Sequence, residues 1–508
     1  MLNLTLGEIA RIVGGTVHGD PEITITGAVE FDSRKINQGD LFVALGGTRV
    51  DGHDFAVAAQ EKGAHATLAF RPVETPAVLV PALKEYSTDS YATEHDRDGS
   101  VAAVLAALGK LARYVVDTLA QEHHTHTGCQ TALTVIGVTG SAGKTSTKDM
   151  MASIFSAQAP TVAPPGSFNN EVGHPYTVLR CNQDTQYLIA ELSARGIGHV
   201  AHLAAIAPPH IGVVLNVGSA HLGQFGSRAT IAQAKGELVE ALADTGSAIL
   251  NADDEYVVAM AQRTKARVLY FSTTGQKEII QGDSQIAVDF YATDVTLDEL
   301  ARPQFQLHVL GQAPRKVHLA VHGKHQVANA LAAIAAAYAA GISTEQALKA
   351  LEQHHNLSAH RMDVRLREDN VMIINDAYNA NPESMKAGIE ALISAARHRE
   401  NARSWAVLGA MGELGDDADT AHRLLGEFIA QVGVDKLMVV GDNDQVAALA
   451  ESAGAYGVDT VRVADNAQAI ATLTTQLAAG DVVLLKASHA AQLWTIGQGI
   501  ADSPGSAR

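Results

Sequence analysis

The sequence predicts an α/β protein of three domains, and three observations support this prediction. At 508 residues the chain is longer than a single hydrophobic core usually serves, so several domains are expected. Apolar runs of strand length alternate with helical segments along the middle and the last third of the chain, which is the pattern of parallel sheets covered on both faces. One of these runs leads directly into a glycine-rich loop that opens a helix, a unit that can bind phosphate.

Two changes in the sequence pattern divide the chain. Residues 1–98 indicate a small N-terminal α/β domain, with a strand at 41–45 and a helix at 55–62, and they end in the polar stretch 86–100. Residues 99–357 indicate a central P-loop domain with a doubly wound, mostly parallel sheet. Residues 358–508 indicate a Rossmann-like C-terminal α/β domain.

The individual elements follow from apolar runs and helical spacing. In the central domain we expect helices at 101–120 and 327–340, and strands at 132–138, 187–190, 210–215 and 248–250. In the C-terminal domain we expect strands at 371–375, 405–408, 436–440 and 482–485.

Composition and charge exclude several classes of protein. The formal net charge is −18, and this field would repel the phosphate backbone of a nucleic acid. Cys129 and Cys181 are too few for a disulfide framework. The N-terminus lacks the features of a secretory signal, and the alanine-rich stretch 328–342 is shorter than the ~20 residues of a membrane span. We therefore expect a cytoplasmic protein with no membrane span and no nucleic-acid partner. A monomer is a separate expectation, which these observations do not establish.

The glycine-rich loop carries the strongest functional signal. Gly140 and Gly143 allow a tight turn, Lys144 places a positive charge on the β- and γ-phosphates, and the Thr145 hydroxyl can ligate Mg²⁺. The loop departs from the common phosphate-loop pattern because Val138 stands where the first glycine is expected. The predicted nucleotide contacts of the loop are Thr139, Gly140, Ser141, Ala142, Gly143, Lys144, Thr145 and Ser146.

This variant loop resembles that of the Mur ligase superfamily, which also includes the folylpolyglutamate synthetases. Further segments resemble the same family: Asp32-Ser33-Arg34 with the stretch 39–56, and the stretches 166–173, 376–382 and 408–415. The last three are similar to the members that add D-alanyl-D-alanine to a peptidoglycan precursor, and a DNPR-type motif for diaminopimelate is absent.

The resemblance implies an ATP-dependent ligase. Its acceptor would be UDP-N-acetylmuramoyl-tripeptide, activated as an acyl phosphate, its amine would be D-alanyl-D-alanine, and its cofactors would be ATP and two Mg²⁺ ions. One alternative is a relative that adds a single L-lysine or diaminopimelate to the dipeptide precursor. Polyglutamylation of a folate is a more distant one, and a non-catalytic nucleotide-binding protein is the alternative from another class.

The resemblance also implies roles for particular residues. Alone, Glu191 after its strand and His221 in its loop would more often be structural, but their motif positions match Mg²⁺ ligands of the family. Lys235 matches a carbamylated lysine, which would be an anion able to ligate or orient Mg²⁺. The implied catalytic residues are Lys144, Lys235 and His221, and the implied metal ligands are Thr145, Glu191, His221 and carbamylated Lys235. The implied further ATP contacts are Asn329, Arg361 and Asp376, and the implied substrate contacts are Asp32, Ser33, Arg34, Asn169, Asn170, Tyr378 and Asn379.

Two histidine features are left out of this site. His489, in Lys486-Ala487-Ser488-His489, stands where many relatives have arginine, so a permanent cation is lost there. The cluster of His123, His124 and His126 has no identifiable partner ligands, and it indicates a solvated linker rather than a metal site.

Overall fold

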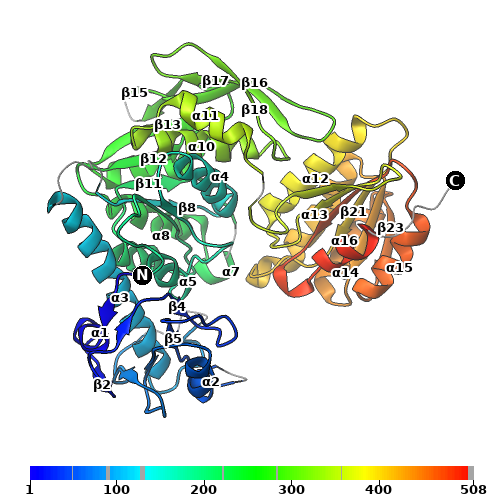
Figure 1. Ribbon diagram of the computed structural model, residues 1–508. Helices are drawn as coiled ribbons and strands as arrows, with labels where there is room; N and C mark the ends of the chain where they lie inside the picture. The colour runs from blue at the N-terminus through cyan, green and yellow to red at the C-terminus, as the bar shows by residue number, and fades with distance from the viewer. Residues whose placement is uncertain are drawn as a thin grey trace.

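Three α/β domains follow one another along the chain in the computed structural model (Figure 1). The structure describes residues 1–47, 50–86, 92–125, 132–219, 222–281, 284–355 and 357–501. The N-terminal domain lies below the central domain in this view, and the C-terminal domain lies to one side of it. The predicted fold class is confirmed.

The N-terminal domain is built on a five-stranded sheet of order β2-β7-β6-β5-β4. Its first helix begins with a capping box, in which Thr5 and Glu8 satisfy each other's backbone N–H groups. The elements are β1 (Leu4–Thr5), α1 (Leu6–Val13), β2 (Thr16–His18), β3 (Thr24–Ile25), β4 (Val29–Glu30), β5 (Leu41–Val43), α2 (Ala56–Glu61), β6 (Ala66–Ala69) and β7 (Ala77–Leu79).

The central domain contains a nine-stranded sheet of order β18-β17-β16-β13-β12-β11-β8-β10-β9. Strands β8 to β13 and β16 pair in parallel, whereas β16, β17 and β18 pair antiparallel. Its first elements along the chain are α3 (Ser100–Thr125), β8 (Thr134–Thr139), α4 (Lys144–Ser156), β9 (Thr161–Val162), α5 (Gly173–Val178), β10 (Tyr187–Glu191), α6 (His199–Ile206), β11 (Ile211–Val214), α7 (Leu222–Phe225) and α8 (Arg228–Glu240). They are followed by β12 (Ser247–Asn251), α9 (Glu255–Ala259), β13 (Arg267–Ser272), β14 (Glu278–Gln281), β15 (Ser284–Ala287), β16 (Phe290–Leu297), β17 (Pro303–Val309), β18 (Arg315–His318), α10 (Gln326–Ala339) and α11 (Thr344–Glu352).

The C-terminal domain contains a six-stranded sheet of order β19-β20-β24-β21-β22-β23, parallel except for β19. Its elements are β19 (Asp363–Leu366), β20 (Met372–Asn375), α12 (Pro382–Arg397), β21 (Ser404–Leu408), α13 (Ala418–Val432), β22 (Lys436–Val440), α14 (Asp444–Ala455), β23 (Asp459–Val463), α15 (Asn466–Gln476), β24 (Val482–Lys486), the short 3₁₀ helix η4 (His489–Ala491) and α16 (Trp494–Ala501).

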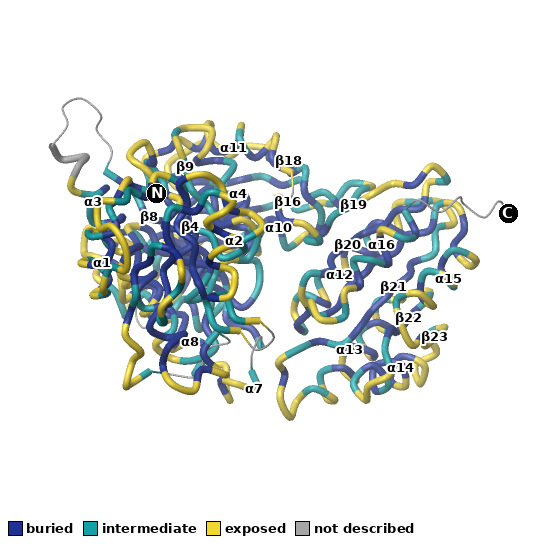
Figure 2. Tube along the Cα trace, turned by 60° about the horizontal axis from the view of Figure 1, so that its bottom comes forward, coloured by how far each residue is buried: buried dark blue, intermediate teal, exposed yellow. Residues whose placement is uncertain are grey.

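The N-terminal domain shares a hydrophobic core with the central domain, whereas the C-terminal domain has cores that are largely its own. One buried cluster runs from Leu4 and Leu68 of the N-terminal domain through α3 to Val135 and Leu188 of the central sheet. The clusters on the two faces of the C-terminal sheet consist almost entirely of residues after Met362. Figure 2 shows these buried strands as dark interiors of separate bodies. The N-terminal domain is therefore fixed to the central domain by shared apolar packing, whereas the C-terminal domain meets it through polar loops.

The predicted strands lie where the structure has β8, β10, β11, β12, β20, β21, β22 and β24, and no end differs by more than two residues. The helix predicted at 101–120 extends to residue 125. Strands β13 to β18 were not predicted from the sequence. Among the described residues, no helix is both long and apolar enough to cross a membrane.

Candidate active site

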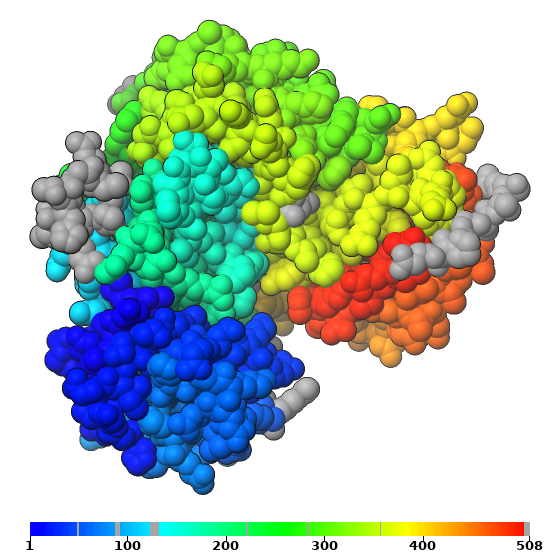
Figure 3. Space-filling view, in the orientation of Figure 1, coloured from blue at the N-terminus to red at the C-terminus, as the bar shows by residue number. Residues whose placement is uncertain are grey.

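A cavity of about 1190 Å³ opens between the central and C-terminal domains and reaches the end of the N-terminal domain. Figure 3 shows the hollow on the molecular surface between the N-terminal and C-terminal domains. The phosphate loop, the segment 167–171 and the end of β10 form its central wall, and loops of the C-terminal domain face them. At the other end, Leu83, Tyr86 and Thr93 connect the cavity to the N-terminal domain.

The phosphate loop joins β8 to α4 as the sequence predicted. Gly140 and Gly143 have φ values of 159° and 85°, and a Cβ on Gly143 would lie 2.5 Å from Asn329 Oδ1. Asn216 Oδ1 accepts hydrogen bonds from the N–H groups of Ser141 and Ala142, at 3.0 and 2.9 Å. The N–H groups that open α4 have no partner within the helix, so this end of the cavity suits an anion.

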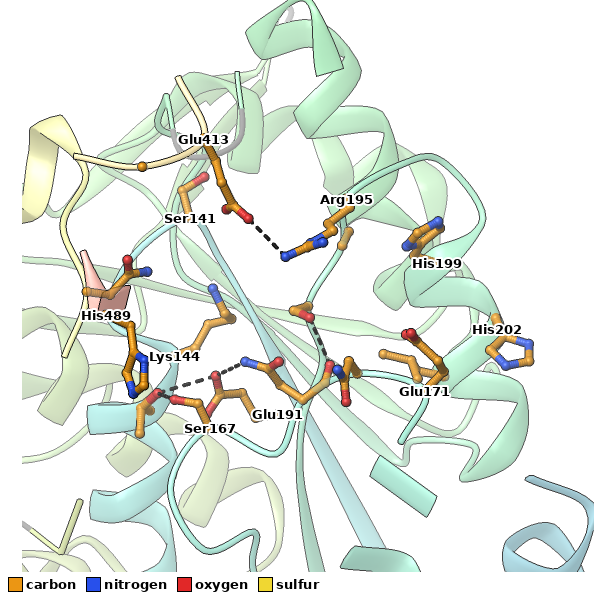
Figure 4. A pocket seen from close by; sticks show the side chains of 18 of the residues that line it. Ser141, Lys144, Ser167, Glu171, Glu191, Arg195, His199, His202, Glu413 and His489 are labelled. Carbon is orange, nitrogen blue, oxygen red and sulfur yellow. Dashed lines mark hydrogen bonds and ion pairs between the residues drawn. The ribbon is translucent and has the colours of Figure 1, made fainter. Parts of the chain in front are cut away.

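Lys144 and Thr145 lie in this wall with Glu191. Lys144 donates to Gly140 O at 2.7 Å, and burial lowers the pKa of its amine, with Arg361 adding to this effect and Glu191 opposing it. Thr145 Oγ1 lies 2.7 Å from Ser167 Oγ and donates to Glu191 Oε1 at 3.3 Å. Figure 4 shows Lys144, Ser167 and Glu191 in this wall.

The oxygen atoms around Glu191 fit a magnesium ion. Glu191 Oε1 also accepts from Asn169 Nδ2 at 2.7 Å, while the buried Oε2 has no hydrogen-bond partner among the described residues. A buried carboxylate oxygen without a partner is costly unless a cation or a ligand reaches it. In the described part of the chain, no group of three histidine, cysteine or acidic side chains gathers at one point, so any ion here would need phosphate or water oxygens as well.

Lys235 is almost completely buried in α8, with 3% of its surface exposed. Burial lowers the pKa of its amine well below the ordinary value, and the nearby charge of Lys144 lowers it further. A neutral amine is the form that can attack CO₂ to give a carbamate, with loss of a proton. The environment of Lys235 therefore fits the predicted modification, which stays a prediction.

Two predicted ATP contacts lie beside the cavity rather than in its lining. Asn329 is at the start of α10 behind the loop, where its Oδ1 accepts from Thr147 Oγ1 at 3.1 Å and its amide donates to Gln326. Asp376 forms an ion pair with buried Lys486 and accepts from Met362 N at 3.2 Å. The amine of Lys486 therefore already balances the negative charge of the Asp376 carboxylate. The predicted contact of Asp376 with ribose stays a prediction.

The C-terminal domain contributes Arg361 to the wall opposite the phosphate loop. Arg361 Nη2 lies 3.1 Å from Ser167 Oγ and 3.4 Å from Thr145 Oγ1, and its guanidinium lies 4.2 Å from the centre of the Tyr378 ring. Its neighbours His360 and Met362 both have positive φ, at 60° and 53°. This strained turn directs the arginine side chain across the domain boundary. Tyr378 and Asn379 also line the cavity.

Of the predicted substrate contacts that remain, some line the cavity and others lie outside it. Asn169 and Asn170 line the cavity, and Asn170 Oδ1 also accepts from Gly173 N at the start of α5. Asp32, Ser33 and Arg34 do not line it; Asp32 and Arg34 form an exposed ion pair. They follow Glu30, which accepts a hydrogen bond from Tyr176 of the central domain at 3.0 Å. His221 lies outside the described residues.

Several cavity residues were not predicted from the sequence. Ser167 and Asn381 contact the loop or its partners, and Arg195 forms an ion pair of 2.9 Å with Glu413 across the two domains (Figure 4). His489, which the sequence analysis left out, lines the C-terminal wall. Asn216 lies between β11 and His221, and no spacing rule marked its contact with the loop.

The fold and the cavity together define a class of protein. A phosphate loop on a parallel sheet faces a second domain that brings an arginine toward the phosphate position, while a third domain leads into the same cavity. This is the arrangement of a nucleotide-dependent enzyme whose second substrate enters between domains.

Comparison with known proteins identifies the family. The Mur ligase middle domain matches residues 138–337, the Mur ligase glutamate ligase domain matches residues 360–489, and the catalytic domain of the Mur ligase family matches residues 26–115. The chain belongs to the Mur ligase family.

Individual relatives span the whole chain. The UDP-N-acetylmuramoyl-tripeptide–D-alanyl-D-alanine ligase of Mycobacterium tuberculosis is 48% identical over 100% of both chains, and that of Escherichia coli is 31% identical over 90% of both. The crystal structure of MurF from Acinetobacter baumannii matches with a TM-score of 0.79 at 29% identity, over 98% of this chain and 99% of that one. A MurF ligase from Thermotoga maritima in complex with ADP matches with a TM-score of 0.73 at 26% identity, over 94% and 98%.

Proposed function

We propose that this chain is an ATP-dependent ligase that joins D-alanyl-D-alanine to UDP-N-acetylmuramoyl-tripeptide and releases ADP and phosphate. The observation that carries the proposal is the single cavity in which the phosphate loop, Arg361 and the N-terminal domain meet. The relative of that name that is 48% identical over its full length supports the choice of substrates.

In the first step the acceptor carboxylate attacks the γ-phosphorus of ATP, the bond to the β–γ bridging oxygen breaks, and an acyl phosphate and ADP are formed. Both partners are negative, so the step depends on cations that neutralise charge as it develops. Lys144 approaches from the phosphate loop and Arg361 from the opposite wall, and both are positioned by contacts within the protein. In the second step the amine of the dipeptide attacks the acyl carbon through a tetrahedral intermediate, and phosphate leaves.

Magnesium belongs to the proposal because the free buried oxygen of Glu191 and the hydroxyl of Thr145 lie together at the phosphate end. When bound, Mg²⁺ would neutralise phosphate charge there. Carbamylated Lys235 would add an anion behind it, and His221 is proposed as a further ligand from the sequence motif alone. We propose two Mg²⁺ ions, as the resemblance to the Mur ligases implies.

The proposed residue roles follow the same division of the cavity. Residues 139–146, Asn329, Arg361 and Asp376 are proposed to bind ATP, and Asn169, Asn170, Tyr378 and Asn379 are proposed to bind the peptide or the dipeptide. Asp32, Ser33 and Arg34 are proposed to bind the uridine end, because Glu30 and Phe31 directly before them pack on Tyr176 of the central domain. We also propose the domain limits 1–98, 99–357 and 358–508, a monomer, and a cytoplasmic location.

The deciding experiment measures Mg²⁺-dependent phosphate release from ATP with UDP-N-acetylmuramoyl-tripeptide as acceptor. D-Ala-D-Ala, D-Ala, L-Lys and meso-diaminopimelate are compared as amines, and the ligated product is confirmed by its mass. Release and product with D-Ala-D-Ala alone are expected. Activity with L-Lys or diaminopimelate on the dipeptide acceptor would instead assign the single-amino-acid ligase, and no activity with any pair would contradict both.

A further inference from the structure

His489 occupies a defined place in the C-terminal wall of the cavity. It opens η4, directly after β24, and its side chain is exposed to the cavity beside Ser488. The imidazole lies edge-on to the Tyr378 ring at 5.3 Å between centroids and 4.8 Å from the ring of Trp494. Two aromatic rings thus fix its orientation. Among the described residues, neither ring nitrogen of His489 has a hydrogen-bond partner, so an N–H group is available to a ligand.

The other cations of the cavity are engaged elsewhere. Lys144 and Arg361 lie at the phosphate end, and Arg195 is paired with Glu413. His199 and His202 belong to α6 on the central domain, at the end toward the N-terminal domain, as Figure 4 shows. In the described part of the C-terminal wall, His489 is therefore an imidazole that can donate an N–H away from the phosphates, with the amide of Asn379 as the neighbouring donor.

The geometry around Tyr378 fits a short peptide. Arg361 lies over one face of the ring at 4.2 Å, and His489 lies at its edge. The amine of the incoming dipeptide has to reach the acyl phosphate near Arg361, and an extended dipeptide spans about 7 Å. A dipeptide that extends from Arg361 past the Tyr378 ring would place its carboxylate on the side of His489.

We propose that His489, together with the Ser488 hydroxyl, binds the C-terminal carboxylate of the incoming dipeptide. This inference rests on the proposed function. It adds the residue that distinguishes a dipeptide with a free C-terminal carboxylate from one whose carboxylate is converted to an amide. Imidazole N–H and hydroxyl groups both hydrogen-bond carboxylate oxygens, and a hydrogen bond to a charged group is stronger than one between neutral groups.

The test compares D-Ala-D-Ala with its C-terminal amide, which keeps the amine but lacks the carboxylate, in the phosphate-release assay. His489→Leu keeps an apolar side chain between Tyr378 and Trp494 but removes the N–H. The KM for D-Ala-D-Ala should rise about 10- to 100-fold in this variant, as expected for the loss of a hydrogen bond to a charged group. The KM for the amide and the KM for ATP should each change less than about twofold.

His489→Arg and His398→Leu complete the experiment. Arginine supplies a permanent cation and two N–H groups, so this variant should keep a low KM for the dipeptide. His398 is exposed at the end of α12 with its ring nitrogen on Ser394 O, so its substitution should change nothing. Equal losses with acid and amide in His489→Leu, a rise in the KM for ATP, or no change at all would each overturn the inference. Failure of the wild-type protein to release phosphate with D-Ala-D-Ala would instead contradict the proposed function.

Discussion

At the scale of single residues, the site depends on buried ionisable groups. Glu191 is almost fully buried, yet only one of its carboxylate oxygens is hydrogen-bonded. Lys235 is a buried amine in which desolvation favours the neutral form. A core evolved for stability alone would avoid both groups, because burying an ionisable group is destabilising. Their presence beside the phosphate loop indicates that a ligand completes them.

Replacing Lys235 by alanine tests the interpretation that this buried amine serves the active site. Turnover should fall by about 100-fold, the size of effect seen when a group that positions a metal is lost. The affinity for ATP, measured by titration calorimetry, should change little because Lys235 is not part of the phosphate loop. Exposed Lys277→Ala serves as the control and should behave as wild type. Added formate should restore part of the activity of Lys235→Ala, and no recovery at any concentration would argue against the carbamate.

Replacing Lys144 by alanine should have a different signature. This lysine supplies a charged hydrogen bond to the phosphates, worth about 1.5–3 kcal/mol, so ATP affinity and turnover should both fall by at least about tenfold. Calorimetry with ADP and the phosphate-release assay measure the two effects separately. Unchanged ADP affinity would show that the nucleotide does not lie on this loop.

The sequence predicted the residues of the site better than their contacts. The glycine, lysine and threonine of the phosphate loop form a recognisable pattern because each has a separate chemical task. Asn216 and Ser167 have no such pattern, since their importance comes from distant backbone that folds against them. The pairing of Asp376 with Lys486 was also not predictable, because the two residues are 110 positions apart.

At the scale of elements, the parallel strands were predicted and the antiparallel extension was not. Strands such as β10, β21 and β24 are buried on both faces and form continuous apolar runs. Strands β16 and β17 alternate buried and partly exposed residues, and β16 contains a bulge between Thr293 and Thr296. A bulge breaks the period of two on which a strand prediction depends.

Asn216 links two of these elements, since it follows β11 and holds the loop after β8. Its side chain makes three hydrogen bonds with the backbone of Ser141 and Ala142. Asn216→Ala should destabilise the loop by about 1–3 kcal/mol and weaken ADP binding accordingly, as measured by calorimetry. Asn182→Ala is the matched control, because Asn182 lies in the turn before β10, at the opposite edge of the sheet. Equal ADP affinity in both variants would contradict this role of Asn216.

At the scale of the whole molecule, the cavity exists only because the C-terminal domain lies against the central domain. The contact consists of polar groups and close loops: Glu383 accepts from Ser219 N at 2.8 Å, and Gly223 and Gly415 approach so closely that a Cβ on Gly415 would lie 2.6 Å from Gly223 Cα. Among the described residues, only Leu300 and Ala301 of the central domain join the apolar core of the C-terminal domain. We therefore expect this interface to open and close, and closure would keep water from the acyl phosphate.

The ion pair of Arg195 and Glu413 provides a test of closure. Both side chains are partly exposed, so the pair is worth about 1 kcal/mol at most, and it is weakened by salt. Arg195→Glu and Glu413→Arg each place like charges opposite one another and should lower kcat/KM by about five- to tenfold. The double variant restores opposite charges and should recover most of the activity, with a smaller radius of gyration in solution scattering than either single variant. Arg423→Glu, which disrupts an exposed ion pair with Glu451 inside the C-terminal domain, should leave activity unchanged. If the double variant were as impaired as the single ones, Arg195 and Glu413 would act on the substrates directly rather than through domain closure.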